Sequence, residues 1–496
     1  MSSVLVASTH LMPLEEVVPG AMAVKGLSKS SILTQRRRVR VPAQTGTSYQ
    51  SSAGAGAGGR QVTWVIADAG GLLDPASIVI TYNQLVTGTG TVVPDDGHPF
   101  TKFQVILNGQ MLTDNQQAAK YTNIEAKLHT DEAWYKTAGS LCGFELMNGQ
   151  LAAGAAPSST VLATALTQLT AYNPAWGDVR TNAANMVTKY KYAAGTYAYN
   201  PYGGQSRAAP LGLISGVGRM NQYLPLSVLG QLTINAITGL PAEVLYQVNG
   251  NTDGDYSLTQ TFLEYDICVP HPAYSALLEK MANDPAEQGL NLPFESEIMA
   301  TAATVQASTG SLTDNSLIVS RASNNLVEAM CVFQPAAYIA NINYPAQSCF
   351  NHNGTYKFQF RVGSQYFPSL AAEGNASMFA MSLGHSSGLN EVSSCINRTL
   401  WDLTSSVNDG TISEPAWCVG GSKWGADSAI FAYNFRNVKG KSQELDLDGV
   451  SLSGASGSQL VAIVTAASQV LSQPTLCLVA VRVIQCHAGA VRVLGA

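Results

Sequence analysis

Charged residues are scarce in this chain. Asp, Glu, Lys and Arg make up 12% of its 496 residues, against about 25% in an average globular protein. Its surface must therefore consist largely of Ser, Thr, Asn, Gln and Gly. Such a surface suits a protein that packs against neighbouring molecules, and it also fits adhesive and secreted β-proteins.

The chain also lacks the patterns of several common classes of protein. It has no apolar run of about 18 residues, so no membrane span is expected. The N-terminal stretch "MSSVLVASTHLMPLEEVVPG" has no basic start and is interrupted by Pro and Glu, which argues against a signal peptide. We therefore interpret the N-x-S/T sequences at Asn353, Asn375 and Asn397 as chance matches.

The eight cysteines form no CxxC pair and no Cys/His spacing typical of zinc. Several stand inside apolar runs such as "EAMCVFQP", which predicts free, buried thiols. This favours folding in a reducing compartment, although disulfides stay open as an alternative. The seven His residues are isolated from one another, and "DLDGV" and "NTDGD" are turns without the terminal Glu of a calcium loop. We expect no metal and no cofactor.

One short pattern is typical of an enzyme. "GHSSG", residues 384–388, fits the G-x-S-x-G elbow with Ser386 as nucleophile, and His487 follows downstream. That elbow needs a parallel sheet built from βαβ units, and the chain does not alternate strands with regular helices. We therefore expect no enzymatic activity, and a Ser386 hydrolase is the weakest alternative.

Positive charge is concentrated near the N-terminus, although the whole chain has a formal net charge of −6. Residues 1–60 hold seven Lys and Arg residues against two Glu and end in the Gly-rich "SSAGAGAGGR". This composition predicts a flexible basic arm. Its "RRRVR" cluster consists of Arg36, Arg37, Arg38 and Arg40. These arginines either contact phosphates or an acidic neighbour or lie on a solvated arm that guides packing, and their segment either pairs as a strand or stays extended.

From residue 61 the sequence alternates as half-buried strands do. "PASIVITYNQLVTG" and "PFTKFQVILNGQMLTD" are examples, and Asn108–Gly109 in the second predicts a hairpin turn. Helices are expected only over "NQQAAKYTNIEAKLHTDEAWYK", over "PAYSALLEKMAND" with Pro272 near its first turn, and around "EVSSCINRTLWDLTSS". The chain is too long for a single hydrophobic core, since such cores stop growing near about 250–300 residues. We predict an all-β protein in two halves that divide near residues 284–292, with a long insertion over 137–218.

The stretch "KFQFRVGSQYFPS" predicts a structural corner. Phe358, Phe360 and Val362 alternate with polar residues until Gly363 interrupts the strand. We interpret Gly363 as a bulge or corner. Its neighbours Tyr366, Phe367 and Pro368 belong to the same corner, with the two aromatic rings as core plugs.

Several of these stretches, in this order, resemble a known family. They are "LLDPASIVITYNQL", a strand ending in "NGQ" followed by "AAKYTNIEAKL", "YLPLSVLGQLTINAI", "TFLEYDICVPHPAYSALLEKM" and "FQFRVGSQYFPS". The chain resembles the double jelly-roll major capsid proteins of eukaryotic DNA viruses, in the lineage of virophages, polinton-like viruses and large algal viruses. The resemblance covers roughly residues 60–480.

The resemblance implies two tandem eight-stranded jelly rolls, over 61–290 and 291–496, preceded by the arm of residues 1–60. It implies a homotrimer, the pseudo-hexagonal capsomer, that tiles an icosahedral shell in the virion. The insertion 137–218 would face outward, and the arm would contact neighbouring capsomers or the genome. Penton and minor capsid proteins would be further partners. The main alternative is a carbohydrate-binding or adhesive β-sandwich protein.

Overall fold

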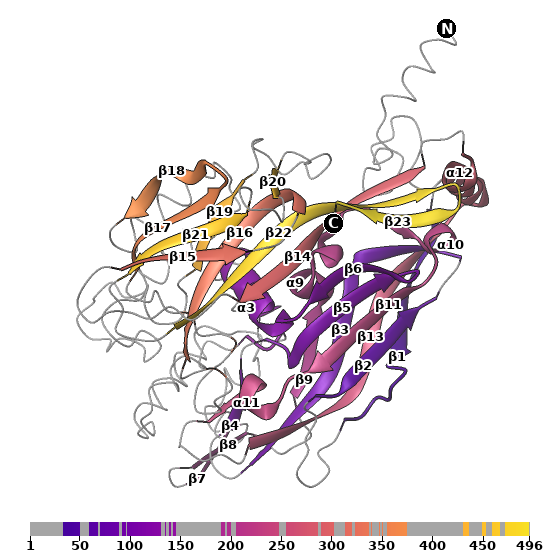
Figure 1. The fold of residues 1–496 in the computed structure, drawn as a ribbon. Helices are drawn as coiled ribbons and strands as arrows, with labels where there is room; N and C mark the ends of the chain where they lie inside the picture. The colour runs from indigo at the N-terminus through magenta and orange to yellow at the C-terminus, as the bar shows by residue number, and fades with distance from the viewer. Residues whose placement is uncertain are drawn as a thin grey trace.

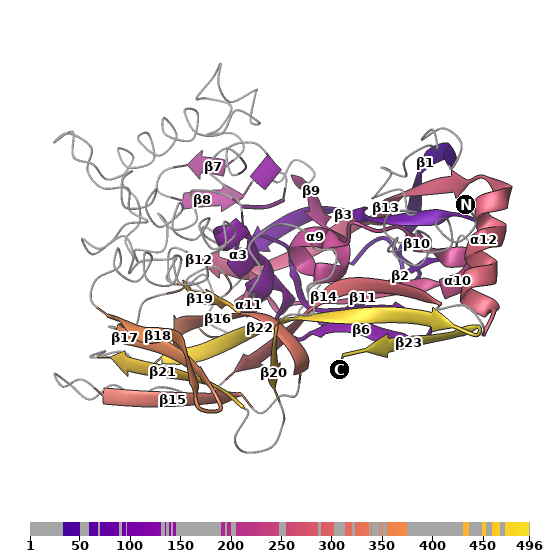
Figure 2. The same ribbon diagram turned by 90° about the horizontal axis from the view of Figure 1, so that it is seen from above.

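A computed structural model describes residues 33–49, 59–144, 190–301, 313–373 and 430–495, the last four ranges with short internal gaps. Its strands form two halves that lie side by side, as Figures 1 and 2 show, and each half consists of two main sheets. Short helices lie between the halves and at one end of the molecule. No helix of the described residues is long and apolar enough to cross a membrane.

The first half consists of two antiparallel sheets that face each other. One sheet has the order β1 (Leu33–Pro42), β13 (Gly254–Pro270), β3 (Leu72–Gly88) and β9 (Gln205–Pro210), and β10 (Leu224–Pro225) also pairs with β3. The other has the order β2 (Gln61–Ile66), β11 (Leu232–Thr238), β5 (Phe100–Leu107) and β6 (Gln110–Asn115). Two small ribbons lie beside them, β4 (Val92–Pro94) with β12 (Leu245–Gln247) and β7 (Tyr190–Ala193) with β8 (Thr196–Tyr199).

The second half repeats this architecture. One sheet has the order β14 (Leu290–Thr301), β22 (Ser472–His487), β16 (Ser323–Pro335) and β19 (Ile430–Asn434), and β20 (Val450–Leu452) and β23 (Ala490–Leu494) extend it. The other has the order β15 (Thr313–Val319), β21 (Leu460–Ala466), β17 (Thr355–Val362) and β18 (Gln365–Glu373).

The two halves have the same topology. If the eight main strands of each half are counted along the chain, one sheet has the order 1-8-3-6 and the other 2-7-4-5 in both halves. Two facing four-stranded sheets with this connectivity define a jelly roll. The predicted fold class, an all-β double jelly roll, is confirmed.

Local sequence explains the individual strands. In β2 the residues Val62, Trp64 and Ile66 are buried and alternate with more exposed ones, which is the period of a strand with one face in the core. Asn108 and Gly109 join β5 to β6 with φ of 47° and 79°. Positive φ at both residues is the conformation that the Asn-Gly pair favours in a hairpin, so the predicted turn is confirmed.

Two of the three expected helices are present. α3 (Ala118–His129) follows β6, and α12 (Pro272–Asn283) joins the two jelly rolls, with His271 as its N-cap. The short helices α9 (Leu211–Ile214), η4 (Gly216–Arg219), α10 (Leu226–Leu229) and α11 (Pro241–Val244) belong to the first half. The third expected helix lies outside the described residues.

Two long strands connect the cores of the jelly rolls. Leu292 at the start of β14 and Ile484 near the end of β22 are buried in the first core, whereas Leu476 and Leu478 of β22 are buried in the second. At about 3.3 Å per residue such long strands reach across both cores. The division near residue 290 therefore follows the order of strands, while the packing of side chains crosses it.

The structure changes two predicted boundaries. Residues 33–42, assigned to a flexible arm, form β1, because Val39 and Val41 pack on the first core. The segment from Gln205 onward, assigned to the insertion 137–218, forms β9, α9 and η4, because Leu211, Ile214 and Val217 are buried in the same core. Residues 145–189 lie outside the described part.

Five of the eight cysteines are described, and all five are free and buried: Cys142, Cys268, Cys331, Cys477 and Cys486. This agrees with the predicted thiols. Burial raises the pKa of the Cys142 thiol to about 12, so it stays protonated at neutral pH and is a poor nucleophile.

Candidate functional surfaces

No group of three or more His, Cys, Asp or Glu residues that could hold a metal ion occurs in the described ranges. Two polar networks stand out instead. One lies on the outer face of the sheet that contains β1, and the other lies between the two jelly rolls.

The outer network begins with the alternation of β1. Arg36, Arg38 and Arg40 point away from the core, since the intervening Val39 and its neighbour Val41 pack on it. β1 pairs with β13 in a register that sets Arg38 opposite Asp266 and Arg40 opposite Glu264. Oppositely charged residues that face each other across two strands stabilise the pairing.

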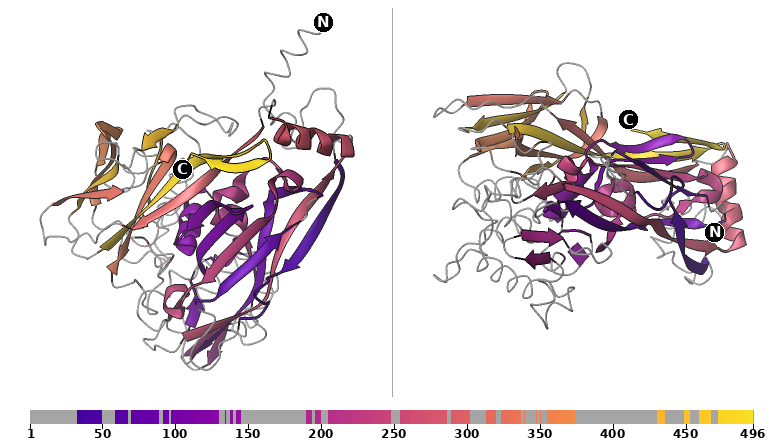
Figure 3. Two further views of the ribbon diagram at one scale, coloured as in Figure 1. Left: turned by 45° about the vertical axis from the view of Figure 1, so that its right-hand side comes forward. Right: turned by 90° about the horizontal axis from the view of Figure 1, so that it is seen from below.

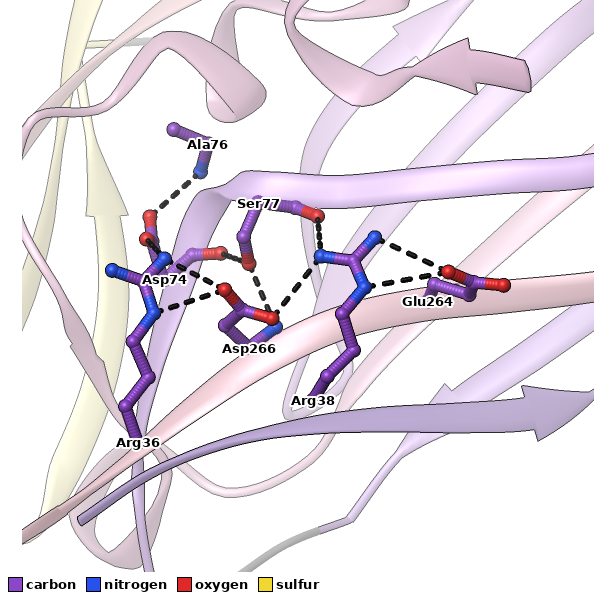
Figure 4. A network of polar contacts seen from close by, with 7 residues as sticks. All are labelled: Arg36, Arg38, Asp74, Ala76, Ser77, Glu264 and Asp266. Atoms are coloured by element: carbon purple, nitrogen blue, oxygen red, sulfur yellow. Dashed lines mark hydrogen bonds and ion pairs between the residues drawn. The ribbon is translucent and has the colours of Figure 1, made fainter.

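Each of the three arginines is held by carboxylates of the neighbouring strands, and Figure 4 shows the contacts of Arg36 and Arg38. Nη2 of Arg36 lies 2.7 Å from Asp266 and 3.1 Å from Asp74. Nη1 of Arg38 lies 3.1 Å from Asp266. Nε of Arg40 lies 2.8 Å from Glu264. We call these six residues the β1 ladder, and its formal charges cancel.

Asp266 is the centre of the β1 ladder. Its backbone N–H donates to Oγ of Ser77 at 2.8 Å, and its carboxylate accepts from both Arg36 and Arg38 (Figure 4). Burial alone would raise the pKa of Asp266, but the hydrogen bonds from the two arginines outweigh it and hold the pKa below its usual range.

The ladder bears on the predicted role of Arg36, Arg37, Arg38 and Arg40. Arg36, Arg38 and Arg40 already have acidic partners in their own sheet, whereas Arg37 alternates with them along β1. A phosphate would compete with these carboxylates for the guanidinium groups. Contact of the cluster with nucleic acid or with a neighbouring chain stays a prediction.

The second network joins the jelly rolls through Arg219 of η4. Its guanidinium lies 2.9 Å from Glu125 of α3 and 3.0 Å from Glu295 of β14, and it donates to the hydroxyl of Tyr121 at 2.8 Å. Burial by itself would lower the pKa of Arg219, yet the nearby carboxylates hold it well above its usual value. A planar guanidinium with five donors can serve such a set of partners.

Glu297 of β14 adds a third carboxylate to this network between the jelly rolls. Its side chain is almost fully buried, and Oε2 accepts from the backbone N–H of Gly216 at 3.1 Å and from Oγ of Ser215 at 3.4 Å. Burial raises the pKa of Glu297 to about 7. Residue 216 must be glycine because a Cβ there would collide with the backbone oxygen of Glu295.

A buried lysine also bridges the halves. Nζ of Lys120 on α3 donates to Gln334 of β16 at 3.1 Å and lies 3.4 Å from Oγ1 of Thr475 on β22. Burial lowers the pKa of Lys120 to about 8. Around it Tyr121 and Ile124 of α3 pack on apolar residues of the second jelly roll.

The predicted corner at Gly363 is a hairpin. Val362 pairs with Gln365, so Gly363 and Ser364 form a two-residue turn between β17 and β18, and Gly363 has a φ of 59°. A glycine with positive φ at the first turn position is a standard hairpin solution. The bulge interpretation was therefore wrong at this residue, because the strands pair directly on both sides of the turn.

The two aromatic residues after the turn point to opposite faces of the sheet. Phe367 points inward, with its ring centroid 5.0 Å from that of Phe435, and Pro368 is buried. Tyr366 is 44% exposed, so its assignment as a core plug was wrong. Adjacent residues of a strand face opposite sides of the sheet.

Several predicted residues lie outside the described part of the chain. These are Ser386, Asn353, Asn375 and Asn397. His487, the proposed partner of Ser386, ends β22 at its hairpin with β23, where it pairs with Ala490.

Sequence reasoning did not predict the polar network between the two jelly rolls. Arg219, Glu125 and Glu297 come from three separated stretches, and none belongs to a motif. One signal was available in "LPFESEIM", where Glu295 and Glu297 interrupt an apolar strand of a chain poor in charge. Buried carboxylates of this kind need partners.

The double jelly roll defines the class of fold to which the chain belongs, and solved structures share it. The chain is similar to the capsid of the virus PBCV-1, as a quasi-atomic model, with a TM-score of 0.51 and 10% identity over 93% of this chain and 97% of that one. It is similar to the Sputnik virophage structure, with a TM-score of 0.50 and 11% identity over 94% and 89%. It is similar to the Faustovirus major capsid protein, with a TM-score of 0.50 and 8% identity over 94% and 92%.

Sequence comparisons add nothing to this. No protein-family model and no curated protein sequence matches the chain. The similarity is therefore one of fold, and it spans nearly the whole length of both chains.

Proposed function

We propose that this chain is a major capsid protein that assembles into an icosahedral virus shell. The observation that carries the proposal is the duplicated jelly roll, with one strand order in both halves, which matches capsid structures over more than nine-tenths of this chain. The scarcity of charge supports it, because a capsid subunit contacts neighbours over much of its surface. The expected localisation is the virion.

The assembly unit is a homotrimer. Three chains of two jelly rolls each give a ring of six similar units, the pseudo-hexagonal capsomer implied by the resemblance. Closed rotational symmetry of this kind is the usual form of a homo-oligomer. Penton and minor capsid proteins are further partners, and the basic N-terminal segment contacts the genome or adjacent capsomers.

Light scattering and negative-stain imaging of the purified chain test this proposal. We expect a mass about three times 52.2 kDa and particles with a hexagonal outline. A monomer at all concentrations would rule out the obligate capsomer and favour the adhesive β-sandwich alternative, for which binding to an array of glycans is the direct assay. Ester hydrolysis that is lost in Ser386→Ala would instead support the hydrolase.

A further inference from the structure

Two equivalent strands of the chain have different surroundings. β6 is the fifth main strand of the first jelly roll, and β18 is the fifth of the second, and each ends its sheet. Strand edges left uncovered invite pairing or packing by another chain. We therefore compare what packs on β6 and on β18, because an edge strand on which nothing packs is a candidate contact for a partner.

Within the chain, the second jelly roll covers β6. β14 and β23 pack against it, and the backbone oxygen of Leu112 accepts from Oγ of Ser296 at 3.3 Å and from Nη1 of Arg482 at 2.8 Å. The first strand of one jelly roll thus lies on the fifth strand of its neighbour.

β18 has no such cover from the described residues. Leu370 is 83% exposed and Tyr366 is 44% exposed, and Ser369 between them is exposed as well. A large apolar side chain exposed to this degree on an edge strand is unfavourable for a lone molecule. The backbone of this segment is nonetheless fixed, because Nε2 of Gln359 donates to the carbonyl oxygens of Pro368 at 2.7 Å and of Ser369 at 3.3 Å.

The strand equivalent to β14 in the first jelly roll is β1. It also ends its sheet, and it lies at the opposite end of the molecule from β18 in Figures 1 and 2. Figure 3 shows from two further sides that the sheet of β1 and the sheet of β18 are separated by the body of the molecule. One chain therefore cannot bring β18 and β1 together, whereas two chains arranged head to tail can.

We propose that β18 of one copy docks beside β1 of a second copy and so repeats between chains the contact that β6 makes with β14 within the chain. The inference rests on the proposed capsid function and specifies the surface by which the trimer closes. A head-to-tail contact of this kind produces a ring when its rotation closes.

The chemistry of the two surfaces is compatible. The arginines of the β1 ladder are neutralised by Asp74, Asp266 and Glu264, so a neighbour covers no net charge there. Their aliphatic stems offer an apolar surface to Leu370, and a guanidinium packs well on the ring of a tyrosine such as Tyr366. Arg40 already stacks in this way, 4.6 Å above the ring of Phe262.

The test is Leu370→Lys, with Ile318→Lys as its matched control. Ile318 is 55% exposed on β15, the other edge strand of the same sheet. We expect Leu370→Lys to lower the mass in light scattering from three chains to one, with thermal unfolding of the monomer unchanged, and Ile318→Lys to stay trimeric. If the wild type forms trimers and both Leu370→Lys and Tyr366→Lys do so too, this inference is wrong while the proposed function stands.

Hydrogen exchange identifies the second surface. Amides of β18 and of β1 should both exchange more slowly in the wild-type trimer than in Leu370→Lys monomers. Protection of β18 without protection of β1 would mean that a different surface receives it and would overturn the proposal. A wild type that is monomeric at every concentration would refute the proposed function itself.

Discussion

Asn108 and Gly363 occupy equivalent positions in the two jelly rolls. Each is the first residue of the two-residue turn that joins the fourth main strand to the fifth, and their φ angles are 47° and 59°. The turn is Asn-Gly in the first half and Gly-Ser in the second. Gly109 at the second turn position also has a positive φ, of 79°, whereas Ser364 at that position does not. The place of the turn is thus preserved in both jelly rolls, while its sequence and its second residue's conformation differ.

Substitution of the turn glycine should weaken the second jelly roll. Gly363→Ala places a Cβ in the left-handed region, which costs about 1–2 kcal/mol. We expect the free energy of unfolding in a denaturant titration to fall by that amount. Ser364→Ala, at the other turn position, is the control and should change it little. An equal loss in both variants would show that the turn does not depend on the backbone of Gly363.

Stability should fall between about pH 5 and pH 7 because of Glu297. Its pKa is about 7 in the folded chain against 4.5 for an ordinary glutamate, so over this range the folded state retains a proton that the unfolded state has lost. The loss can reach about 3 kcal/mol, since each pKa unit corresponds to 1.36 kcal/mol. Stability is highest below the unfolded pKa and is lost as the pH rises to the folded pKa.

Glu297→Gln tests this linkage, since glutamine mimics the protonated acid. Chemical unfolding at several pH values should show a flatter profile for Glu297→Gln than for the wild type. Glu279→Gln, at an exposed site on α12, is the control and should keep the wild-type slope. A wild-type slope in Glu297→Gln would mean that another group binds the proton.

Substitution of Arg219, which lies between the two jelly rolls, should lower the free energy of unfolding by more than the changes above. Arg219→Met leaves Glu125 buried without its cation, and breaking a buried ion pair in this way typically costs about 3–5 kcal/mol. Arg492→Met, at an exposed site on β23, should change the unfolding free energy by less than about 0.5 kcal/mol. The double variant Arg219→Met/Glu125→Gln should recover part of the loss. Strict additivity of the two changes would show that the pair is not coupled.

The β1 ladder should respond to salt. Asp266→Asn removes the carboxylate shared by Arg36 and Arg38, and exposed pairs of this kind contribute about 0.2–1 kcal/mol. The variant should be less stable than the wild type at low ionic strength, and the difference should shrink in 1 M salt, where screening is strong. A difference that does not vary with salt would mean that packing, not charge, holds β1 in place.

The sequence by itself determined the local elements. Alternation predicted the strands, Asn108–Gly109 predicted its hairpin, and Pro272 marked the start of α12. These features depend on residues close together in the chain, so their physical causes can be recognised in a short window. The ordered resemblance then implied how the strands assemble.

Only the tertiary structure decided which distant residues meet. Arg36 belonged by composition to a free arm, yet it pairs with Asp266, 230 residues away. Tyr366 and Phe367 look alike in the sequence, and strand alternation sends one ring outward and the other inward. Glu297 is a proton-binding residue because the fold buries it beside Gly216. Charge pairing and burial depend on long-range packing, which no local pattern in the sequence contains.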